Sequence, residues 1–229
     1  MKLSILMPVY NEEERIAEAL KQALAVEYPC EIELVVVNDG SRDGTGAILD
    51  GAADDARLRV ITHPRNAGKG AAIKTAVDSA NGDYMVILDA DLEYDPLDIP
   101  KLLDPVLDGR AKVVYGNRTF GSHSAYSFWY VMGNKAVTTA ANVLFNSYIG
   151  DLETCFKLLP VSLYRSLEIK SRGFGMEAEV TGKLLRRKIR PYEVPISYRA
   201  RGREEGKKIT WKDGVEALWI LGRERARKR

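Results

Sequence analysis

Two aspartates one residue apart, Asp89 and Asp91, directly follow an apolar run at residues 85–88. Such a run is typical of a central strand of a parallel sheet, and open α/β sheets bind their ligands at the carboxyl ends of these strands. Two carboxylates at that edge repel each other unless a cation or hydrogen-bond donors lie between them, and oxygen ligands suit Mg²⁺ or Mn²⁺. The spacing therefore indicates a divalent-metal site, and a solvated acidic turn is the alternative.

The sequence around this pair alternates between strand and helix patterns. Strand patterns are present at residues 3–10, 32–37, 58–62, 84–88, 112–115 and 189–198. The alternation predicts right-handed crossovers and an α/β fold, with a Rossmann-like, mostly parallel central sheet that has helices on both faces. Pro191 and Pro195 place the last strand at an edge of the sheet. Asn11 is expected to cap the helix that follows the first strand.

Length and composition are those of an ordinary soluble protein. The 229 residues are 45% hydrophobic and 29% charged, and we expect one domain spanning residues 1–229. Cys30 and Cys155 are far apart and lack the spacing of a zinc site or a disulfide framework. Pro8 comes too early for a signal peptide, and no apolar run is long enough to cross a bilayer. A cytoplasmic protein is therefore expected.

The formal net charge of +2 conceals an asymmetry along the chain. Residues 1–169 hold 16 Lys and Arg against 24 Asp and Glu, whereas residues 170–229 hold 18 against 8, so the balances are −8 and +10. The basic part suits an anionic partner, which can be nucleic acid, acidic lipid headgroups or a phosphorylated small molecule. It lacks the interleaved aromatic residues of a base-stacking platform, so nucleic acid is not expected.

The C-terminal segment combines an aromatic stripe with a basic end. One face of a predicted helix carries Trp211, Val215, Leu218 and Trp219, and a run rich in Arg follows at residues 223–229. Two interpretations are open: the stripe packs on the core, or it docks on an anionic membrane surface. In the second case the protein is peripheral at the inner face of the cell membrane.

Gly68, Lys69 and Gly70 open a predicted helix and look like part of a phosphate loop. The full pattern Gly-x-x-x-x-Gly-Lys-Ser/Thr is missing, as is Gly-x-Gly-x-x-Gly after the first strand, so ATPases and NAD-dependent enzymes are not supported. Lys69 can still contact a phosphate near a helix N-terminus, and a solvated lysine is the alternative.

Four motifs stand in order along the first half of the chain: Pro8-Val9-Tyr10-Asn11-Glu12, Val37-Asn38-Asp39-Gly40-Ser41-Arg42-Asp43-Gly44-Thr45, Asn66-Ala67-Gly68-Lys69-Gly70 and Asp89-Ala90-Asp91. Together they resemble the family 2 glycosyltransferases of the GT-A fold. Segments 116–118, 151–157 and 205–209 are similar to the branch that glycosylates polyprenyl phosphates, which includes dolichyl-phosphate mannosyltransferase. The resemblance covers almost the whole chain. Glu93 replaces the Gln usual in that branch, so GDP-mannose and UDP-glucose are both kept as donor types.

The resemblance implies that residues 1–118 bind a nucleotide-sugar donor. Residues expected to contact the donor are Pro8, Tyr10, Glu12, Asp39, Lys69, Asp89 and Lys207. Asp39 would accept a hydrogen bond from the base. Asp91 would bind Mg²⁺ or Mn²⁺ and act in catalysis, and Asp89 and Glu93 would complete the metal site. The cation would stabilise the charge that develops on the departing β-phosphate.

Residues 119–229 would bind the acceptor and include the basic C-terminal helix. A polyprenyl phosphate is already largely ionised at neutral pH, so its attack on the anomeric carbon needs cationic positioning rather than a base. Arg118, Arg201 and Lys207 are the expected cations. An alcohol acceptor, the alternative, would require a base, for which Asp151 is the candidate and Glu153 the reserve. Single displacement would invert the anomeric centre.

Two other classes compete with this one. A sugar-1-phosphate nucleotidyltransferase would share the nucleotide-binding sheet, but its Gly-rich, Arg-containing signature after the first strand is missing. A non-catalytic nucleotide- or RNA-binding module would explain the basic end of the chain but not the carboxylates at residues 89–93. The oligomeric state does not follow from the sequence.

Overall fold

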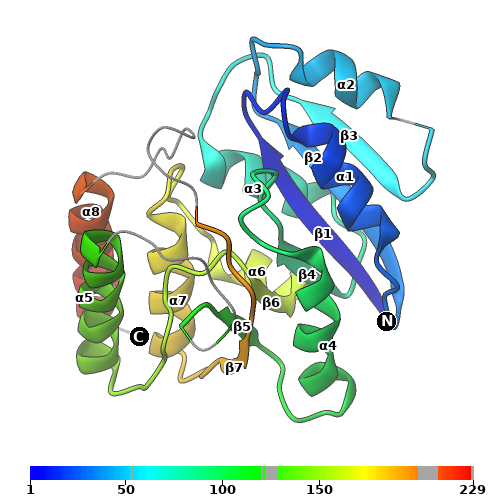
Figure 1. The fold of residues 1–229 in the computed structure, drawn as a ribbon. Helices are drawn as coiled ribbons and strands as arrows, with labels where there is room; N and C mark the ends of the chain where they lie inside the picture. The colour runs from blue at the N-terminus through cyan, green and yellow to red at the C-terminus, as the bar shows by residue number, and fades with distance from the viewer. Residues whose placement is uncertain (53, 120, 122–127, 201–210, 228–229) are drawn as a thin grey trace.

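The computed structural model describes residues 1–52, 54–119, 121, 128–200 and 211–227. These residues form a seven-stranded sheet with the strand order β3-β2-β1-β4-β6-β5-β7 (Figure 1). The strands are β1 Lys2–Val9, β2 Glu31–Asn38, β3 Leu58–Thr62, β4 Tyr84–Ile87, β5 Val114–Asn117, β6 Lys157–Pro160 and β7 Tyr192–Pro195. All neighbours pair in parallel except β6, which is antiparallel to β4 and β5. The predicted mostly parallel sheet is confirmed, with β7 at an edge.

Helices cover both faces of this sheet. They are α1 Ile16–Ala25, α2 Thr45–Gly51, α3 Lys69–Ser79, η1 Pro96–Asp98, α4 Ile99–Leu107, α5 Phe128–Phe145, α6 Val161–Leu167, α7 Met176–Arg186 and α8 Trp211–Ala226. Helices α1, α2 and α4 pack on one face, and α3, α6 and α7 on the other. Helices α5 and α8 stand side by side against α7, on the side of the molecule remote from β3 (Figure 1).

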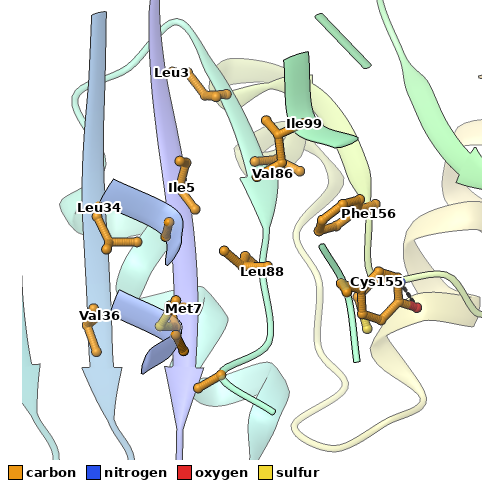
Figure 2. Close-up of a cluster of buried hydrophobic side chains, with 14 of the residues drawn as sticks. Leu3, Ile5, Met7, Leu34, Val36, Val86, Leu88, Ile99, Cys155 and Phe156 are labelled. Atoms are coloured by element: carbon orange, nitrogen blue, oxygen red, sulfur yellow. Dashed lines mark hydrogen bonds between the residues drawn. The ribbon is translucent and has the colours of Figure 1, made fainter. Parts of the chain in front are cut away.

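Side chains of the central strands alternate between two cores. In β1, Ile5 belongs to the core beneath α1 and α4, whereas its neighbour Leu6 belongs to the core beneath α3 and α6. Val36 and Val37 of β2 divide in the same way. Figure 2 shows the first core, where side chains of β1, β2 and β4 gather near Ile99. Burial on both faces explains why these strands read as continuous apolar runs.

The structure corrects the prediction for Asn11. Helix α1 begins at Ile16, and its N-cap residue, Arg15, makes no side-chain capping bond. Asn11 has a φ of 53°, and its Oδ1 accepts a hydrogen bond from Arg42 N at 2.9 Å. The Asn11 side chain therefore links the end of β1 to the turn after β2. Its hydrogen bond to Arg42, which is distant in sequence, replaces the local capping bond that was predicted.

The aromatic stripe of α8 does not pack on the core. Trp211 is 76% exposed and Trp219 is 63% exposed. The opposite face of the helix is buried against α5 and α7 and consists of Ala217, Ile220 and Leu221. The interpretation that the aromatic stripe packs on the core is therefore wrong. Separately, none of the described helices combines the length and the apolar character that crossing a bilayer requires.

Candidate active site

A cavity of about 380 Å³ lies where the carboxyl ends of β1, β2 and β4 approach α7 and α8. Ten of the residues predicted from the sequence line it: Pro8, Tyr10, Glu12, Asp39, Lys69, Asp89, Asp91, Glu93, Arg118 and Glu153. The crossovers of a parallel sheet bring them to one edge, and the volume suits a small-molecule ligand. Asp151 is not among the lining residues. Arg201 and Lys207 lie outside the described residues.

Asp39, directly after β2, holds the loop that precedes α3. Its carboxylate accepts hydrogen bonds from Ala67 N at 3.0 Å and from Gly68 N at 2.8 Å. His63 Nδ1 lies 2.7 Å from Asp39 Oδ1, and His63 Nε2 lies 2.9 Å from Thr75 Oγ1 of α3. The carboxylate therefore shapes this side of the cavity through the loop. A hydrogen bond from Asp39 to a nucleobase stays a prediction.

Lys69 is part of the cavity wall. Its Nζ lies 2.7 Å from Asp89 Oδ2 and 3.1 Å from Cys155 Sγ. Burial disfavours a charged ammonium group, but the Asp89 carboxylate, together with Cys155 and Glu177, outweighs burial and raises the pKa of Lys69 well above its usual value. Burial and the same carboxylate also raise the pKa of the Cys155 thiol. Lys69 is thus a buried cation rather than a solvated one.

Two backbone N–H groups in the first turn of α3 donate hydrogen bonds within the protein. Gly70 N donates to Arg172 O at 2.7 Å, and Ala71 N donates to the same oxygen at 3.3 Å. A Cβ at position 70 would collide with Ser171 O, so this close approach requires glycine. These two amides are therefore already used, whereas the Lys69 side chain lies in the cavity wall and can contact a phosphate.

The predicted metal ligands follow β4 in the cavity wall. Asp91 Oδ1 accepts a hydrogen bond from Glu93 N at 3.1 Å, and Glu93 Oε2 accepts one from Tyr198 OH at 2.5 Å. Within the described part of the chain, no three His, Cys, Asp or Glu side chains are grouped to hold a metal ion. Mg²⁺ often takes only one or two protein carboxylates and completes its shell with water and substrate phosphates. Asp89 and Asp91 fit that mode, and the role of Glu93 as a ligand stays a prediction.

Arg118, after β5, forms a buried ion pair with Asp151. Its Nε and Nη2 donate to Asp151 Oδ2 and Oδ1 at 2.6 and 2.8 Å, and Asn134 Nδ2 of α5 donates to Oδ1 at 2.9 Å. Burial alone would raise the pKa of Asp151, but Arg118 outweighs burial and the pKa is lowered. The geometry makes Asp151 a positioning residue for the guanidinium, and its role as a base stays a prediction.

Glu153, the reserve base, does line the cavity. Burial raises the pKa of this carboxyl group, and the nearby Arg118 only partly opposes the rise. A raised pKa brings a carboxylate closer to the value that suits a general base at neutral pH. An alcohol acceptor would therefore favour Glu153 over the fully buried Asp151.

Sequence reasoning missed several residues that complete the cavity. They are Tyr94, Cys155, Phe174, Glu177 and Tyr198. Tyr94 OH accepts a hydrogen bond from Cys155 N at 3.0 Å, and Glu177 Oε2 accepts one from Lys157 Nζ at 2.6 Å. Glu177 lies in the first turn of α7, where acidic residues are favourable in any helix. Nothing in its sequence context therefore distinguished it from an ordinary helix residue.

The sheet is mostly parallel, and its strand ends surround one cavity with carboxylates, a lysine and an arginine. This arrangement defines the class of α/β proteins that bind their ligands at the carboxyl ends of the strands. The chain belongs to glycosyl transferase family 2, because the model of that family matches residues 4–167. The matched part runs from β1 to the end of α6. It therefore includes every strand end that carries a predicted donor contact.

Curated relatives include enzymes named for transfer to undecaprenyl phosphate. An undecaprenyl-phosphate 4-deoxy-4-formamido-L-arabinose transferase of Pseudomonas fluorescens is 36% identical over 131 residues, which are 56% of this chain and 38% of that protein. Glycosyltransferase AglJ of Haloferax volcanii is 28% identical over 195 residues, 85% of this chain and 62% of that protein. The chain thus spans about half the length of the curated relatives it matches.

Solved structures share the architecture. Glucosyl-3-phosphoglycerate synthase from Mycobacterium tuberculosis, in complex with Mn²⁺, UDP and glucosyl-3-phosphoglycerate, has a TM-score of 0.73 at 20% identity, covering 97% of this chain and 79% of that chain. TarS 1-349 of S. aureus, in complex with UDP-GlcNAc, has a TM-score of 0.67 at 17% identity, covering 98% and 66%. At these identities the likeness shows the fold alone, and it confirms the GT-A fold.

Proposed function

We propose that this protein transfers a hexose from a nucleoside-diphosphate sugar, of the GDP-mannose or UDP-glucose type, to a polyprenyl phosphate. The reaction is an inverting single displacement that uses Mg²⁺ or Mn²⁺. The observation that carries the proposal is that the carboxylates after β4 and the guanidinium of Arg118 line one cavity. The carboxylates would hold the cation that activates the nucleotide-sugar donor, and the Arg118 guanidinium would bind an anionic acceptor. The relatives named for undecaprenyl phosphate support this acceptor class.

On the donor side, the ends of β1 and β2 form the wall for the nucleoside. Pro8 lies in β1 and Tyr10 directly follows it, and Asp39 holds the loop before α3. Lys69 places a fixed positive charge beside Asp89, where it can hold a diphosphate close to the carboxylates. A divalent cation bound at Asp91 would supply Lewis-acid stabilisation of the leaving phosphate.

On the acceptor side, Arg118 is positioned before any ligand arrives. The pair with Asp151 uses two of the five guanidinium N–H donors, which leaves donors for a phosphate oxygen. The guanidinium group also lies over the Tyr198 ring, with 4.9 Å between Arg118 Cζ and the ring centroid. An ionised phosphate held here needs no general base to attack the anomeric carbon.

The surface formed by α5 and α8 supports a lipid acceptor and a peripheral contact with an anionic membrane. Arg225 Nε donates to Leu144 O at 2.8 Å, so the last turns of the two helices meet and both helices run in the same direction (Figure 1). Their first turns carry Trp129, 79% exposed, and Trp211, 76% exposed. Asp213, in the first turn of α8, lines the cavity. An apolar surface thus borders the place where a lipid phosphate would enter.

Incubation with labelled GDP-mannose or UDP-glucose, Mn²⁺ and either undecaprenyl phosphate or a water-soluble alcohol tests this function. We expect a lipid-linked sugar of inverted anomeric configuration only with undecaprenyl phosphate, and none after removal of the divalent cation. Transfer to the alcohol alone would favour the second candidate, in which Glu153 acts as the base. That candidate is supported by the raised pKa of Glu153 and its place in the cavity wall.

A further inference from the structure

Glu177 is a buried carboxylate in the cavity wall, and only one of its two oxygens accepts a hydrogen bond. Its Oε2 accepts a hydrogen bond from Lys157 Nζ at 2.6 Å. Its Oε1 has no hydrogen-bond donor among the described residues and lies 3.9 Å from Lys69 Nζ. The residue is only 6% exposed. A buried carboxylate oxygen without a donor is unfavourable, so a ligand group that donates a hydrogen bond to it would be favoured here.

Lys157 fixes the orientation of this carboxylate. The ammonium group is 1% exposed and also donates to the backbone oxygens of Leu152 and Thr154. An ammonium group has three donors, so Lys157 is saturated and cannot turn toward a ligand. Glu177 is therefore held in place before a ligand binds, and Oε1 is the atom left to make a contact.

If the nucleoside lies at the ends of β1 and β2, as in the proposed function, Glu177 would lie at the sugar end of the nucleotide sugar. The nucleoside wall comes from β1 and β2, whereas Glu177 comes from α7 on the other side of Asp89 and Lys69. Lys69 Nζ lies between the two carboxylates, 2.7 Å from Asp89 Oδ2 and 3.9 Å from Glu177 Oε1. A carboxylate repels phosphate, so this corner suits a neutral group that donates a hydrogen bond. Phe174 and Ala178 provide an apolar wall beside it.

We propose that Glu177 Oε1 accepts a hydrogen bond from a hydroxyl or amide N–H of the sugar being transferred, and so selects which nucleotide sugars bind. This inference rests on the proposed function, because it assumes a nucleotide-sugar donor in the cavity. A buried hydrogen-bond acceptor of this kind discriminates strongly between nucleotide sugars. A sugar that lacks the matching hydroxyl or N–H leaves the carboxylate oxygen without a hydrogen bond.

Titration calorimetry with UDP, UDP-glucose, GDP and GDP-mannose tests the assignment on the full chain. The readout is the affinity for a nucleotide sugar divided by the affinity for its nucleotide. Glu177→Ala should lower this ratio on the order of 10- to 100-fold and leave the nucleotide affinity unchanged, and Glu177→Gln should have a smaller effect. Glu179→Gln is the matched control, because Glu179 is buried in the same helix, pairs with Lys183 at 2.7 Å and does not line the cavity.

A second measurement needs only the wild-type protein. Among single-deoxy derivatives of the bound nucleotide sugar, one position should bind on the order of tenfold or more weakly, and Glu177→Ala should remove that difference. An unchanged ratio in Glu177→Ala, or equal binding of all deoxy derivatives by the wild type, would overturn the assignment and leave the proposed function intact. A wild-type protein that binds none of the nucleotides or nucleotide sugars would instead contradict the proposed function.

Discussion

The buried pair of Arg118 and Asp151 fixes the direction of the guanidinium group that we propose as the acceptor-binding cation, and it also contributes to the stability of the fold. Asp151 is completely buried and receives donors from both Arg118 and Asn134. Removing one partner of such a pair is costly, because the remaining charge is left in a place that water cannot reach. The carboxylate therefore affects both stability and the direction in which the guanidinium points.

Asp151→Asn should lower the free energy of unfolding by about 3–5 kcal/mol at pH 7. Because the pKa of Asp151 is lowered in the folded protein, its stabilisation is present above about pH 4 and decreases as the pH falls through the folded value. The difference between wild type and variant should therefore shrink in acid. Urea unfolding over this pH range measures it, with the exposed Asp78→Asn as control. A difference that does not vary with pH would contradict the assignment.

Asp91→Asn should leave the protein folded and lower metal-dependent sugar transfer by at least about 100-fold. The substitution keeps the size of the side chain and removes one negative charge from the cavity. Turnover measured at saturating Mg²⁺ or Mn²⁺ checks this, together with a thermal melt for the fold. Turnover equal to that of wild type would exclude a metal role for Asp91.

Position at a strand end is what made most site residues predictable. Tyr10, Asp39 and Asp91 each follow a continuous apolar run, and parallel topology then brings them to one edge. Asp151 and Glu177 have no such local marker. Their partners, Arg118 and Lys157, are distant in sequence and meet them only through tertiary packing.

At the scale of elements, strands buried on both faces were predicted well and short connecting elements were not. The apolar run of β4 was found because two cores exclude polar residues from it. The strand expected at residues 112–115 is β5 Val114–Asn117, since the close pairing of Gly116 with Val194 extends it beyond its apolar part. Helix α6 Val161–Leu167 has 7 residues, too few to show a helical period in sequence.

Helix α8 shows how two apolar faces can mislead. The large residues, such as Trp211 and Trp219, suggested the packed face, yet the smaller Ala217 and Leu221 are buried. The basic end is also not simply solvated, because Arg223 Nη2 lies 3.4 Å from an oxygen of the buried Glu224. Sequence alone does not decide between such faces, because the choice depends on the shape that α5 and α7 present.

The loop before α3 is the element on which nucleotide binding should depend. Asp39→Ala removes the acceptor of Ala67 N and Gly68 N and so releases the loop from the end of β2. We expect UDP or GDP affinity to fall on the order of tenfold, with a smaller change in kcat. Titration calorimetry measures the affinity, with the exposed Asp50→Ala of α2 as control. If the variant bound UDP and GDP with the affinity of the wild type, nucleotide binding would not depend on Asp39.

At the scale of the whole molecule, exposed tryptophans stand on the two helices beside the cavity. The first turns of α5 and α8 carry Trp129 and Trp211, and Asp213 in the first turn of α8 lines the cavity. Along the sequence, residues 170–229 carry a charge balance of +10. Exposed tryptophans in a part of the chain rich in Lys and Arg are expected to contact something apolar and anionic. The division into a donor part at 1–118 and an acceptor part at 119–229 agrees with this arrangement and stays a prediction.

Vesicle flotation of the full chain tests membrane contact. Replacement of Trp129 and Trp211 by Ser should lower the fraction bound to anionic vesicles by on the order of tenfold or more at both low and high salt, because each large apolar side chain removed from water contributes about 1.5–3 kcal/mol. Salt should weaken only the electrostatic part of the binding free energy, to which each Lys or Arg near the membrane surface contributes about 1 kcal/mol. Tyr148→Ser is the control, since Tyr148 is 88% exposed but follows the other end of α5.

The same variant separates membrane contact from chemistry. Neither tryptophan lines the cavity, so transfer to an acceptor presented in detergent should persist while transfer to the same acceptor in vesicles falls. A wild-type protein that does not float with anionic vesicles at low salt would contradict the membrane contact. In that case the exposed tryptophans would have another partner, and a water-soluble acceptor, with Glu153 as its base, would become the better candidate.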